Sequence, residues 1–417
     1  MRVAVIGAGS VGVASAWWLQ QAGFEVTVID KQSQVAQDST RLGGGLLSVG
    51  QARPWARPSA PWQLLTGLFQ DHAPILFRPR IDPRQWEWGA AFLWQCLPSK
   101  TYANILNMVR LAEYSKNLTH QLSTELNIEF QYRHCGVLSI YRHHHDLARA
   151  EHILDRLRDL GIDRRLLSTD EVIDLEPTLA HCASDIIGGD YTSQDAVGDA
   201  YLFTRQLAQH AQDAGVHFLF QTKVTRLLCR HGKVHGLEVI TADGDYESLQ
   251  FDRYVIAQGA ESGLLLHQAG LPYRLYPVKG YTAMFELTAP EHAPEVGVYD
   301  PALRLSFSRL GNQLRASGFA ELSGFDRALN DYRCQLIAAH AQRYFGACIE
   351  PTHVRFWSGL RSATPTNVPL IGRTAIKNLY INTGHSNLGW TMSVGSAKLL
   401  ADVMGQQSPE LDFPYLR

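Results

Sequence analysis

Three closely spaced glycines near the start of the chain carry its clearest chemical signal. Gly7, Gly9 and Gly12 fit the pattern G-x-G-x-x-G, with Ser10 and Val11 between the last two. In such a turn the first glycine permits a tight bend, the second lets the backbone approach a pyrophosphate, and the third lets the following helix pack closely on the strand. The N–H groups and positive dipole end of that helix would bind the diphosphate.

The residues on either side of these glycines supply the elements that such a site needs. An apolar run over residues 3–6 is typical of a buried parallel strand, and a second such run covers residues 26–29. Asp30 and Lys31 end the second strand. A carboxylate at this position accepts hydrogen bonds from a ribose 2′-hydroxyl and repels a 2′-phosphate. The segment therefore predicts an adenine dinucleotide site rather than a glycine-rich structural turn, but the motif alone does not separate FAD from NAD.

Length and composition narrow the class of protein. The chain has 417 residues, of which 45% are hydrophobic, enough for two domains with sizeable cores. A net charge of −2 and the lack of a basic run argue against a nucleic-acid partner. Because the first strand begins at residue 2, we expect no signal peptide, and no apolar run is long enough for a transmembrane helix. We therefore expect a cytoplasmic protein, with peripheral contact to the cytoplasmic face of the inner membrane as an open alternative.

Cysteine and histidine patterns give no sign of a metal site. The six cysteines are scattered and without a C-x-x-C pair, which favours free thiols over disulfides or metal ligands: Cys96, Cys135, Cys182, Cys229, Cys334 and Cys348. The run His143 to His145 follows an apolar strand and precedes a charged helix. We interpret it as an exposed turn rather than a metal site.

The order of predicted elements indicates an α/β protein with two interleaved domains. Residues 1–52, 185–270 and 355–417 are expected to form a Rossmann-like dinucleotide-binding domain. Residues 53–184 and 271–354 are expected to form an α+β substrate domain on a largely antiparallel sheet. The periodicity predicts helices over 105–126, 147–160, 200–214 and about 329–344, strands over 217–221, 224–228, 234–240, 281–287, 303–308 and 314–319, and turns at Gly244 and Gly311.

Further contacts to the dinucleotide are expected from loops that follow the strands of the first domain. A polar stretch and a run of glycines follow the second strand, and a later strand enters a glycine turn. The residues concerned are Ser39, Thr40, Gly43, Gly44, Val224, Ala257 and Gly259.

Residues 53–98 have an unusual composition. They contain five of the nine tryptophans together with the arginines Arg53, Arg57, Arg78, Arg80 and Arg84. An interfacial membrane patch uses tryptophan, leucine and arginine in this way. An ordinary core helix flanked by a proline-rich loop has the same composition, so both interpretations stay open.

Several segments in this order resemble the FAD-dependent D-amino-acid oxidase superfamily, above all its bacterial D-amino-acid dehydrogenase small-subunit type. The segments that carry the resemblance are residues 11–17, 108–115, 276–281 and 383–392. The resemblance implies a deeply buried, extended FAD and oxidation of a D-amino acid to an imino acid, which hydrolyses to a 2-oxo acid and ammonia. It also implies that electrons pass to a quinone or respiratory acceptor. Relatives that attach flavin covalently carry a cysteine where this chain has Trp357 or Ser358, so the FAD is expected to be non-covalent.

The resemblance also assigns roles to residues. Arg361 matches the arginine that holds the substrate carboxylate, although a structural Arg–Asp pair is an alternative; a guanidinium gives a bidentate, charge-assisted grip. Tyr281 matches a tyrosine near the pocket. His385 is a candidate general base, but its position suggests that it shapes the backbone. The loop and helix start at the flavin pyrimidine edge comprise Gly384, Asn387, Leu388, Gly389, Trp390 and Thr391.

The chain departs from the family pattern around the substrate pocket. Ser362 follows Arg361 where relatives have proline, and Gly43, Leu46 and Gln51 stand where they have Asn, Gln and Tyr. These changes leave the substrate open: sarcosine, glycine or a proline or hydroxyproline isomer is the alternative within the enzyme class. A flavoprotein that binds a membrane or a partner, with little turnover of its own, is the alternative from another class.

Overall fold

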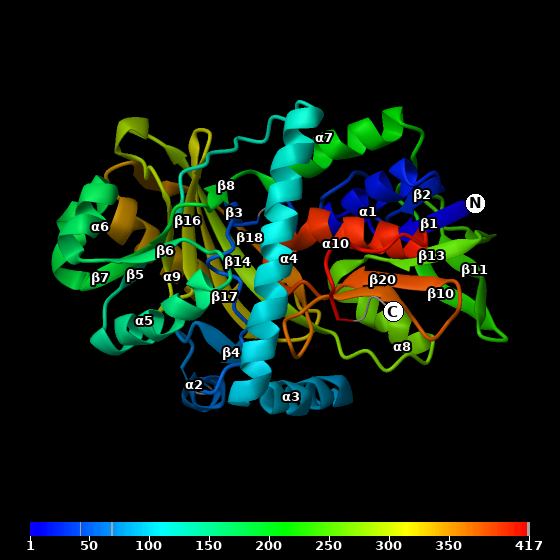
Figure 1. Cartoon of the computed structure of the whole chain (residues 1–417), viewed down its shortest axis with the longest axis horizontal. Helices are drawn as coiled ribbons and strands as arrows, with labels where there is room; N and C mark the ends of the chain where they lie inside the picture. The colour runs from blue at the N-terminus through cyan, green and yellow to red at the C-terminus, as the bar shows by residue number, and fades with distance from the viewer. Residues whose placement is uncertain (42, 68–69, 415–417) are drawn as a thin grey trace.

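The computed structural model describes residues 1–41, 43–67 and 70–414 of the chain. Leu42, in the predicted glycine loop, and Leu68 and Phe69, in the tryptophan-rich stretch, lie outside the described residues. Figure 1 shows two lobes, each built on a large sheet, with the long helix α4 (Pro98–Glu125) running between them. The interface between the lobes is where the candidate site lies.

The first lobe is built on a six-stranded sheet that begins with the two strands predicted around the glycines. Its strand order is β19 (Leu370–Arg373), β20 (Leu379–Thr383), β13 (Arg253–Ile256), β1 (Arg2–Ile6), β2 (Glu25–Ile29) and β9 (His217–Leu219). All neighbours are parallel except β19 and β20. The central strand β1 is buried from Val3 onward, as expected for a strand covered on both faces. The carboxyl ends of these strands therefore meet at one edge, where a ligand site is expected.

Four helices cover this sheet and share one apolar core: α1 (Ser10–Gln21), α4, α7 (Ala200–Asp213) and α10 (Gly389–Met404). Small residues let α4 and α10 approach closely, since a Cβ added to Gly395 would lie 2.7 Å from the Cβ of Ser115. Helix α4 begins seven residues before the predicted position 105, because Pro98 occupies its first turn, where the fixed φ of proline favours a helix start.

The second lobe is built on a nine-stranded mixed sheet. Its order is β18 (Ile349–Ala363), β14 (Tyr276–Leu287), β17 (Gln313–Leu322), β16 (Leu305–Leu310), β15 (Gly297–Asp300), β5 (Val137–Tyr141), β7 (Gly188–Thr192) and β6 (Arg164–Leu167), and β4 (Ile75–Phe77) pairs with β17. Helix α9 (Asp331–Phe345) packs on one face. The sheet continues to Thr192 in β7 and to Ala363 in β18, so its strands extend past residues 185 and 355. The domain boundaries placed there stay a prediction.

Smaller elements complete the chain. A three-stranded sheet consists of β10 (Lys223–Arg230), β11 (Lys233–Ile240) and β12 (Tyr246–Leu249), and a two-stranded sheet of β3 (Leu46–Leu47) and β8 (Ala196–Val197). The remaining helices are α2 (Ala60–Gly67), α3 (Pro83–Gln95), α5 (His144–Arg158), α6 (Thr169–Leu175) and α8 (Ser262–Gln268). The turns predicted at Gly244 and Gly311 are confirmed, and both glycines have positive φ.

Candidate active site

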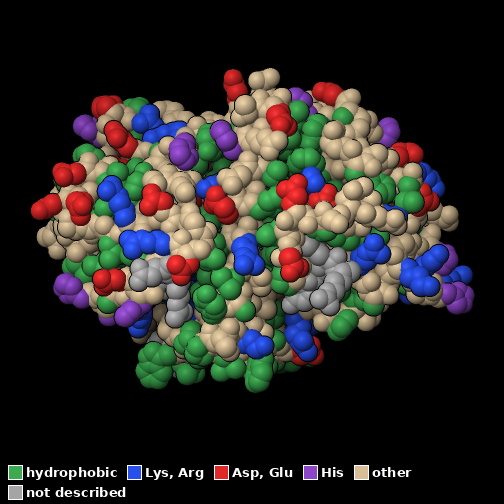
Figure 2. Space-filling view, in the orientation of Figure 1, with side chains coloured by type: hydrophobic (Ala, Val, Ile, Leu, Met, Phe, Trp, Pro, Cys, Tyr) green, Lys and Arg blue, Asp and Glu red, His purple; other side chains and the backbone are tan. Residues whose placement is uncertain are grey.

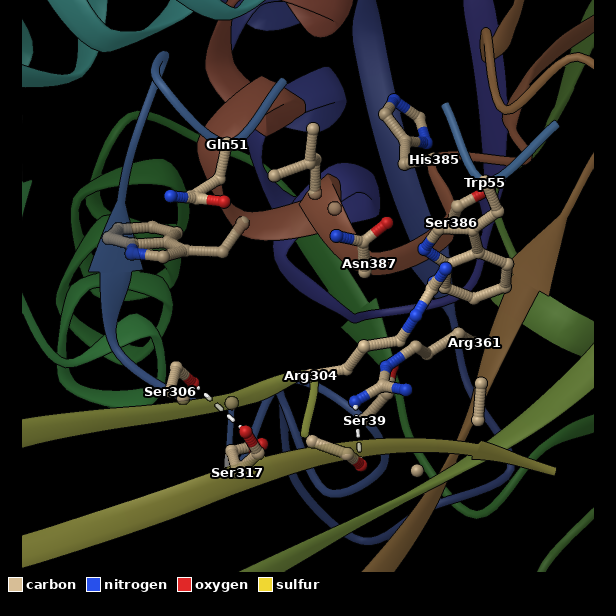
Figure 3. A pocket seen from close by; sticks show the side chains of 18 of the residues that line it. Ser39, Gln51, Trp55, Arg304, Ser306, Ser317, Arg361, His385, Ser386 and Asn387 are labelled. Atoms are coloured by element: carbon tan, nitrogen blue, oxygen red, sulfur yellow. Dashed lines mark hydrogen bonds between the residues drawn. The ribbon is translucent and has the colours of Figure 1, made fainter. Parts of the chain in front are cut away.

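A cavity of about 1200 Å³ extends from the glycine turn in the first lobe to the concave side of the nine-stranded sheet in the second. Figure 3 shows its substrate end, where Arg304 and Arg361 point inward from the sheet side while His385, Ser386 and Asn387 approach from the opposite side. One continuous cavity therefore joins the predicted dinucleotide site to the predicted substrate arginine.

The glycines at the nucleotide end are required by close backbone contacts. Gly7 has φ +111°, and a Cβ there would lie 2.5 Å from the carbonyl oxygen of Ala257. A Cβ at Gly12 would lie 1.8 Å from the carbonyl oxygen of Gly7. Gly9 is the N-cap of α1 and brings no side chain, so the first N–H groups of the helix face the cavity. These residues fit the pyrophosphate of a dinucleotide.

Asp30 lies at the carboxyl end of β2, beside these N–H groups. Its Oδ2 accepts a hydrogen bond from the backbone N–H of Ala8 at 2.6 Å, and its Oδ1 accepts one from Gln32 at 2.8 Å. Burial raises the pKa of this carboxyl group, and the two hydrogen bonds partly oppose the rise. Each carboxylate oxygen keeps a further lone pair, so Asp30 still fits a ribose hydroxyl.

Most of the predicted cofactor residues line the cavity, and three do not. Those that line it are Gly7, Gly9, Ser10, Val11, Asp30, Lys31, Ser39, Thr40, Gly43, Gly44, Ala257, Gly259, Gly384, Asn387, Leu388, Gly389 and Trp390. Gly12 lies beneath Gly7 and serves helix packing. Val224, in β10, is buried in an apolar core, and the Thr391 hydroxyl donates to the carbonyl oxygen of Leu46 at 3.3 Å. None of these three residues lines the cavity.

Tyr281 lies elsewhere than expected, which corrects its predicted position near the pocket. Side chains alternate along β14, so Gly280 and Thr282 face the cavity while Tyr281 faces the buried side of the sheet. The Tyr281 hydroxyl donates to Glu321 at 2.7 Å, and burial together with this carboxylate raises its pKa. The residue of this motif that contacts Arg361 is Gly280: a Cβ there would lie 2.4 Å from Cζ of Arg361.

Arg361 extends from β18 into the cavity with its guanidinium oriented by backbone carbonyls. It donates to the carbonyl oxygen of Phe319 at 2.5 Å and to that of Gly318 at 3.4 Å. Burial lowers its pKa to about 10, which leaves it charged at neutral pH. Among the described residues no carboxylate forms an ion pair with Arg361, so the predicted alternative of a structural Arg–Asp pair has no partner there. A charged, desolvated guanidinium without a protein anion is suited to bind a carboxylate ligand.

His385 is buried and bonded to the protein. Its Nε2 lies 2.9 Å from the hydroxyl of Ser396 in α10, and burial lowers the pKa of the imidazole to about 3. Its neighbour Ser386 has φ +53° and accepts a hydrogen bond from the Asn367 amide at 2.9 Å. This arrangement is typical of a residue that shapes the loop before α10 rather than of a base that exchanges protons with a ligand.

Several cavity residues were missed from the sequence or assigned another role. Arg53 and Arg57 were counted in the membrane-like stretch, but both line the cavity, which corrects that part of the interpretation. Their close spacing in a proline-rich loop was the available signal. Tyr299 in β15 and Arg304 in the turn after β15 had no sequence signal, because only the sheet topology brings them beside Arg361.

The histidine run and the cysteines form no metal site in the described part of the chain. His143 to His145 are exposed at the start of α5, and the described residues contain no group of three or more metal-ligating side chains. The six cysteines, all within the described ranges, are free thiols, and none of them lines the cavity. Non-covalent FAD agrees with this arrangement.

Comparison with known proteins identifies the family. The family model DAO, described as FAD dependent oxidoreductase, matches residues 2–403. The chain belongs to this family. The nucleotide end of the cavity is therefore an FAD site, and the residues described above are those that would hold the cofactor.

Curated relatives match the chain over its whole length. It is 40% identical over 417 residues to a D-amino acid dehydrogenase from Dechloromonas aromatica, covering 100% of both chains. It is 38% identical to a D-amino acid dehydrogenase from Agrobacterium fabrum, covering 99% of this chain and 97% of the relative. The fold resembles that of glycine oxidase from Geobacillus kaustophilus, with a TM-score of 0.77 at 19% identity over 100% of this chain and 98% of the other. L-proline dehydrogenase from P. horikoshii gives 0.74 at 19% identity, covering 99% and 95%.

Proposed function

We propose that this protein is an FAD-dependent D-amino acid dehydrogenase that converts a D-amino acid into a 2-oxo acid and ammonia. The substrate carries an α-carboxylate and an α-amine on the same carbon. The observation that carries the proposal is Arg361, a buried guanidinium without a protein carboxylate, in the cavity that contains the FAD site. The D-amino acid dehydrogenases at 38% to 40% identity support the same reaction.

The chain's own residues bind and orient the substrate in this proposal. Arg361 holds the α-carboxylate and so directs the Cα–H bond toward the FAD site, while the carbonyls of Phe319 and Gly318 fix the guanidinium. FAD, when bound, supplies the acceptor for the two electrons and the hydrogen lost from Cα. The substrate amine must be neutral for this loss, so the rate is expected to rise with pH. The cations around the site favour that neutral form, because like charge lowers the pKa of an amine.

The direct test is anaerobic reduction of the flavin in the purified holoenzyme. D-amino acids, their L-enantiomers, glycine, sarcosine and the proline isomers would be added separately while visible absorbance is followed. We expect D-amino acids to bleach the flavin and a quinone analogue to restore its colour faster than air does. Bleaching only by sarcosine, glycine or proline isomers would replace the proposal with a secondary-amine or glycine oxidoreductase.

We further propose that electrons leave through a membrane quinone reached at an apolar surface on α2, α3 and the start of α4. Figure 2 shows hydrophobic side chains gathered along the lower edge, over these helices. Ile81 is fully exposed, Trp62 is 71% exposed and Trp94 is 63% exposed; Leu65, Trp86, Leu93, Leu97 and Tyr102 are also exposed. An exposed apolar cluster with tryptophans beside the arginines of residues 78–84 fits the interface of an anionic bilayer.

Two tryptophans of residues 53–98 do not belong to this exposed surface. Trp88 is buried and donates from Nε1 to the carbonyl oxygen of Ala363 at 2.8 Å, and Trp55 lines the cavity. These two tryptophans belong to the ordinary core and to the cavity, so the membrane proposal is limited to the exposed residues of the stretch. Within the described ranges, no helix combines the length and the hydropathy needed to cross a membrane.

Co-sedimentation with vesicles tests the surface. The double variant Trp62→Ser, Trp94→Ser should bind vesicles of anionic phospholipid about tenfold more weakly than the parent protein, because it removes most of the indole surface that would enter the interface. Tyr246→Ser is the matched control, since Tyr246 is 73% exposed on β12, in the other lobe. Equal binding by all three proteins, or binding by none, would remove the membrane surface from the proposal.

A further inference from the structure

The substrate end of the cavity holds more positive charge than one α-carboxylate requires. Besides Arg361, it is lined by Arg304 from the turn after β15 and by Arg57 from the loop before α2. Within the described residues neither of these two forms an ion pair with a carboxylate. By contrast, the nearby Arg164 is paired with Asp190. A buried cation that lacks a protein anion is costly unless a ligand supplies one.

The three guanidinium groups form one electrostatic cluster. The hydroxyl group of Tyr299 acts on the pKa of all three, and Arg57 and Arg304 repel each other. Burial and this repulsion lower the pKa of Arg304 to about 10, and burial together with the charge of Arg149 lowers the pKa of Arg57. Both stay charged at neutral pH. Figure 3 shows Arg304, from the turn after β15, and Arg361, from β18, entering the same part of the cavity.

The backbone holds Arg304 in a demanding position. Its φ is +53°, a left-handed conformation that residues other than glycine rarely adopt. Gly318 on β17 pairs with the next residue, Leu305, and a Cβ at Gly318 would lie 2.1 Å from the carbonyl oxygen of Arg304. A glycine across the sheet thus makes room for this strained turn, and the turn directs the guanidinium into the cavity.

Arg57 keeps unused hydrogen-bonding capacity. One of its terminal nitrogens donates to Gln63 at 3.2 Å, but its buried Nε has no partner. Asp146 acts on Arg57 at longer range and is itself paired with Arg149 at 3.5 Å. The cluster therefore has donors left over for a ligand oxygen.

We propose that Arg304 and Arg57 form a second anion site beside Arg361, so that the preferred substrate is a dicarboxylic D-amino acid such as D-aspartate or D-glutamate. This inference rests on the proposed function, in which Arg361 holds the α-carboxylate. The side-chain carboxylate then lies at Arg304 and Arg57. The reaction is unchanged in balance: the substrate loses two electrons and two protons to FAD, and hydrolysis of the imine gives ammonia and a 2-oxo diacid.

The first experiment needs no variant. The parent holoenzyme would be assayed with D-glutamate and D-glutamine, which differ only in the charge of the side chain. We expect kcat/KM for D-glutamate to exceed that for D-glutamine by about tenfold or more, the usual scale for a desolvated charge contact. A ratio near one, or one that favours D-glutamine, would overturn the inference even if D-alanine reduces the flavin.

Variants assign the effect to residues. Arg304→Gln and Arg57→Gln should each lower the D-glutamate to D-glutamine ratio about tenfold, and Arg304→Lys should restore part of it. Arg355→Gln is the control, because Arg355 lies on the same strand as Arg361 but is exposed and paired with Glu286 at 3.1 Å. Variants that lose flavin with an unchanged ratio would assign these arginines to the cofactor instead.

A binding measurement separates failure of this inference from failure of the proposed function. Glutarate and its monoamide are not oxidised, and each would be titrated into the holoenzyme while flavin absorbance is followed. The second anion site predicts that glutarate binds about tenfold more tightly than the monoamide. That result without reduction by any D-amino acid would leave the anion site standing and remove the reaction; equal affinities would remove the anion site.

Discussion

The two ends of the cavity are built by different means. At the nucleotide end, backbone groups would bind the cofactor: glycines allow close approach, and the start of α1 presents N–H groups. These residues follow one another within a single β1–α1–β2 unit. At the substrate end, side chains are proposed to bind the ligand, and Arg57, Arg304 and Arg361 come from three distant segments. The geometry of the first end is fixed because its atoms are part of regular structure. The geometry of the second end depends on the contacts that hold its long arginine side chains in place.

Buried arginines sharpen this difference. Arg164 and Arg315 are paired with Asp190 and Asp199, so their charge is neutralised within the protein. Arg57, Arg304 and Arg361, at the substrate end of the cavity, form no ion pair with a carboxylate of the described residues. A paired arginine stabilises the arrangement of strands around it, whereas an unpaired one leaves its counter-ion to the ligand.

The largest effect is expected at the nucleotide end. Gly12→Ala would place a methyl group 1.8 Å from the carbonyl oxygen of Gly7, and backbone cannot move aside as a side chain can. We expect the variant to lose most of its FAD, measured as visible absorbance per protein. Gly89→Ala is the matched control, because a Cβ there meets none of the described atoms within 4 Å and the residue lies inside helix α3. A Gly12→Ala protein with full flavin content would contradict the close contact.

The second effect is expected at the substrate end. Arg361→Met should lower kcat/KM for D-amino acids about 10³-fold, roughly 4 kcal/mol, because the α-carboxylate loses its charged partner. Flavin content should stay at the parent level, since Arg361 belongs to the other end of the cavity. Arg355→Met, on the same strand but exposed, is the control. Unchanged kinetics for Arg361→Met would remove its role in substrate binding.

The same difference explains how much the sequence could predict. The glycine turn and Asp30 were predictable because they lie within thirty consecutive residues, and the strand–helix–strand pattern constrains their geometry. Arg304 was not, because its place beside Arg361 depends on the pairing of β15, β16 and β17, which local pattern does not encode. The 276–281 motif was correctly predicted to lie at the pocket, but the predicted residue, Tyr281, was wrong. A strand turns alternate side chains to opposite faces, so Gly280 faces Arg361 and Tyr281 faces Glu321.

Gly280 gives a smaller and more specific test of the substrate end. Gly280→Ala would bring a methyl group within 2.4 Å of Cζ of Arg361, and the flexible guanidinium would shift rather than the backbone. We expect KM for D-amino acids to rise about 10-fold to 100-fold, with melting temperature and flavin content near those of the parent.

A double variant tests whether Gly280→Ala affects substrate binding through Arg361. If the methyl group acts through Arg361, the double variant with Arg361→Met should be no worse than Arg361→Met alone. Additive losses would show that Gly280 affects the substrate by another route.

The smallest effect concerns His385, a buried group that could carry charge but is held neutral. Its pKa is lowered from the usual 6.5 to about 3 in the folded protein, so between these values the unfolded chain binds more protons. Stability therefore rises with pH across this window and is lost as pH falls through 6.5, by about 1.4 kcal/mol per pH unit for this one group. His385→Gln keeps a hydrogen-bonding side chain beside Ser396 but cannot titrate. Melting temperatures measured from about pH 5 to pH 8 should fall less steeply toward acid for the variant than for the parent. Parallel curves would mean that His385 is charged in the folded state.

If kcat/KM of the variant still rises with pH as in the parent, His385 is not the base that takes the amine proton, and its place at the cavity wall is to hold the loop before α10.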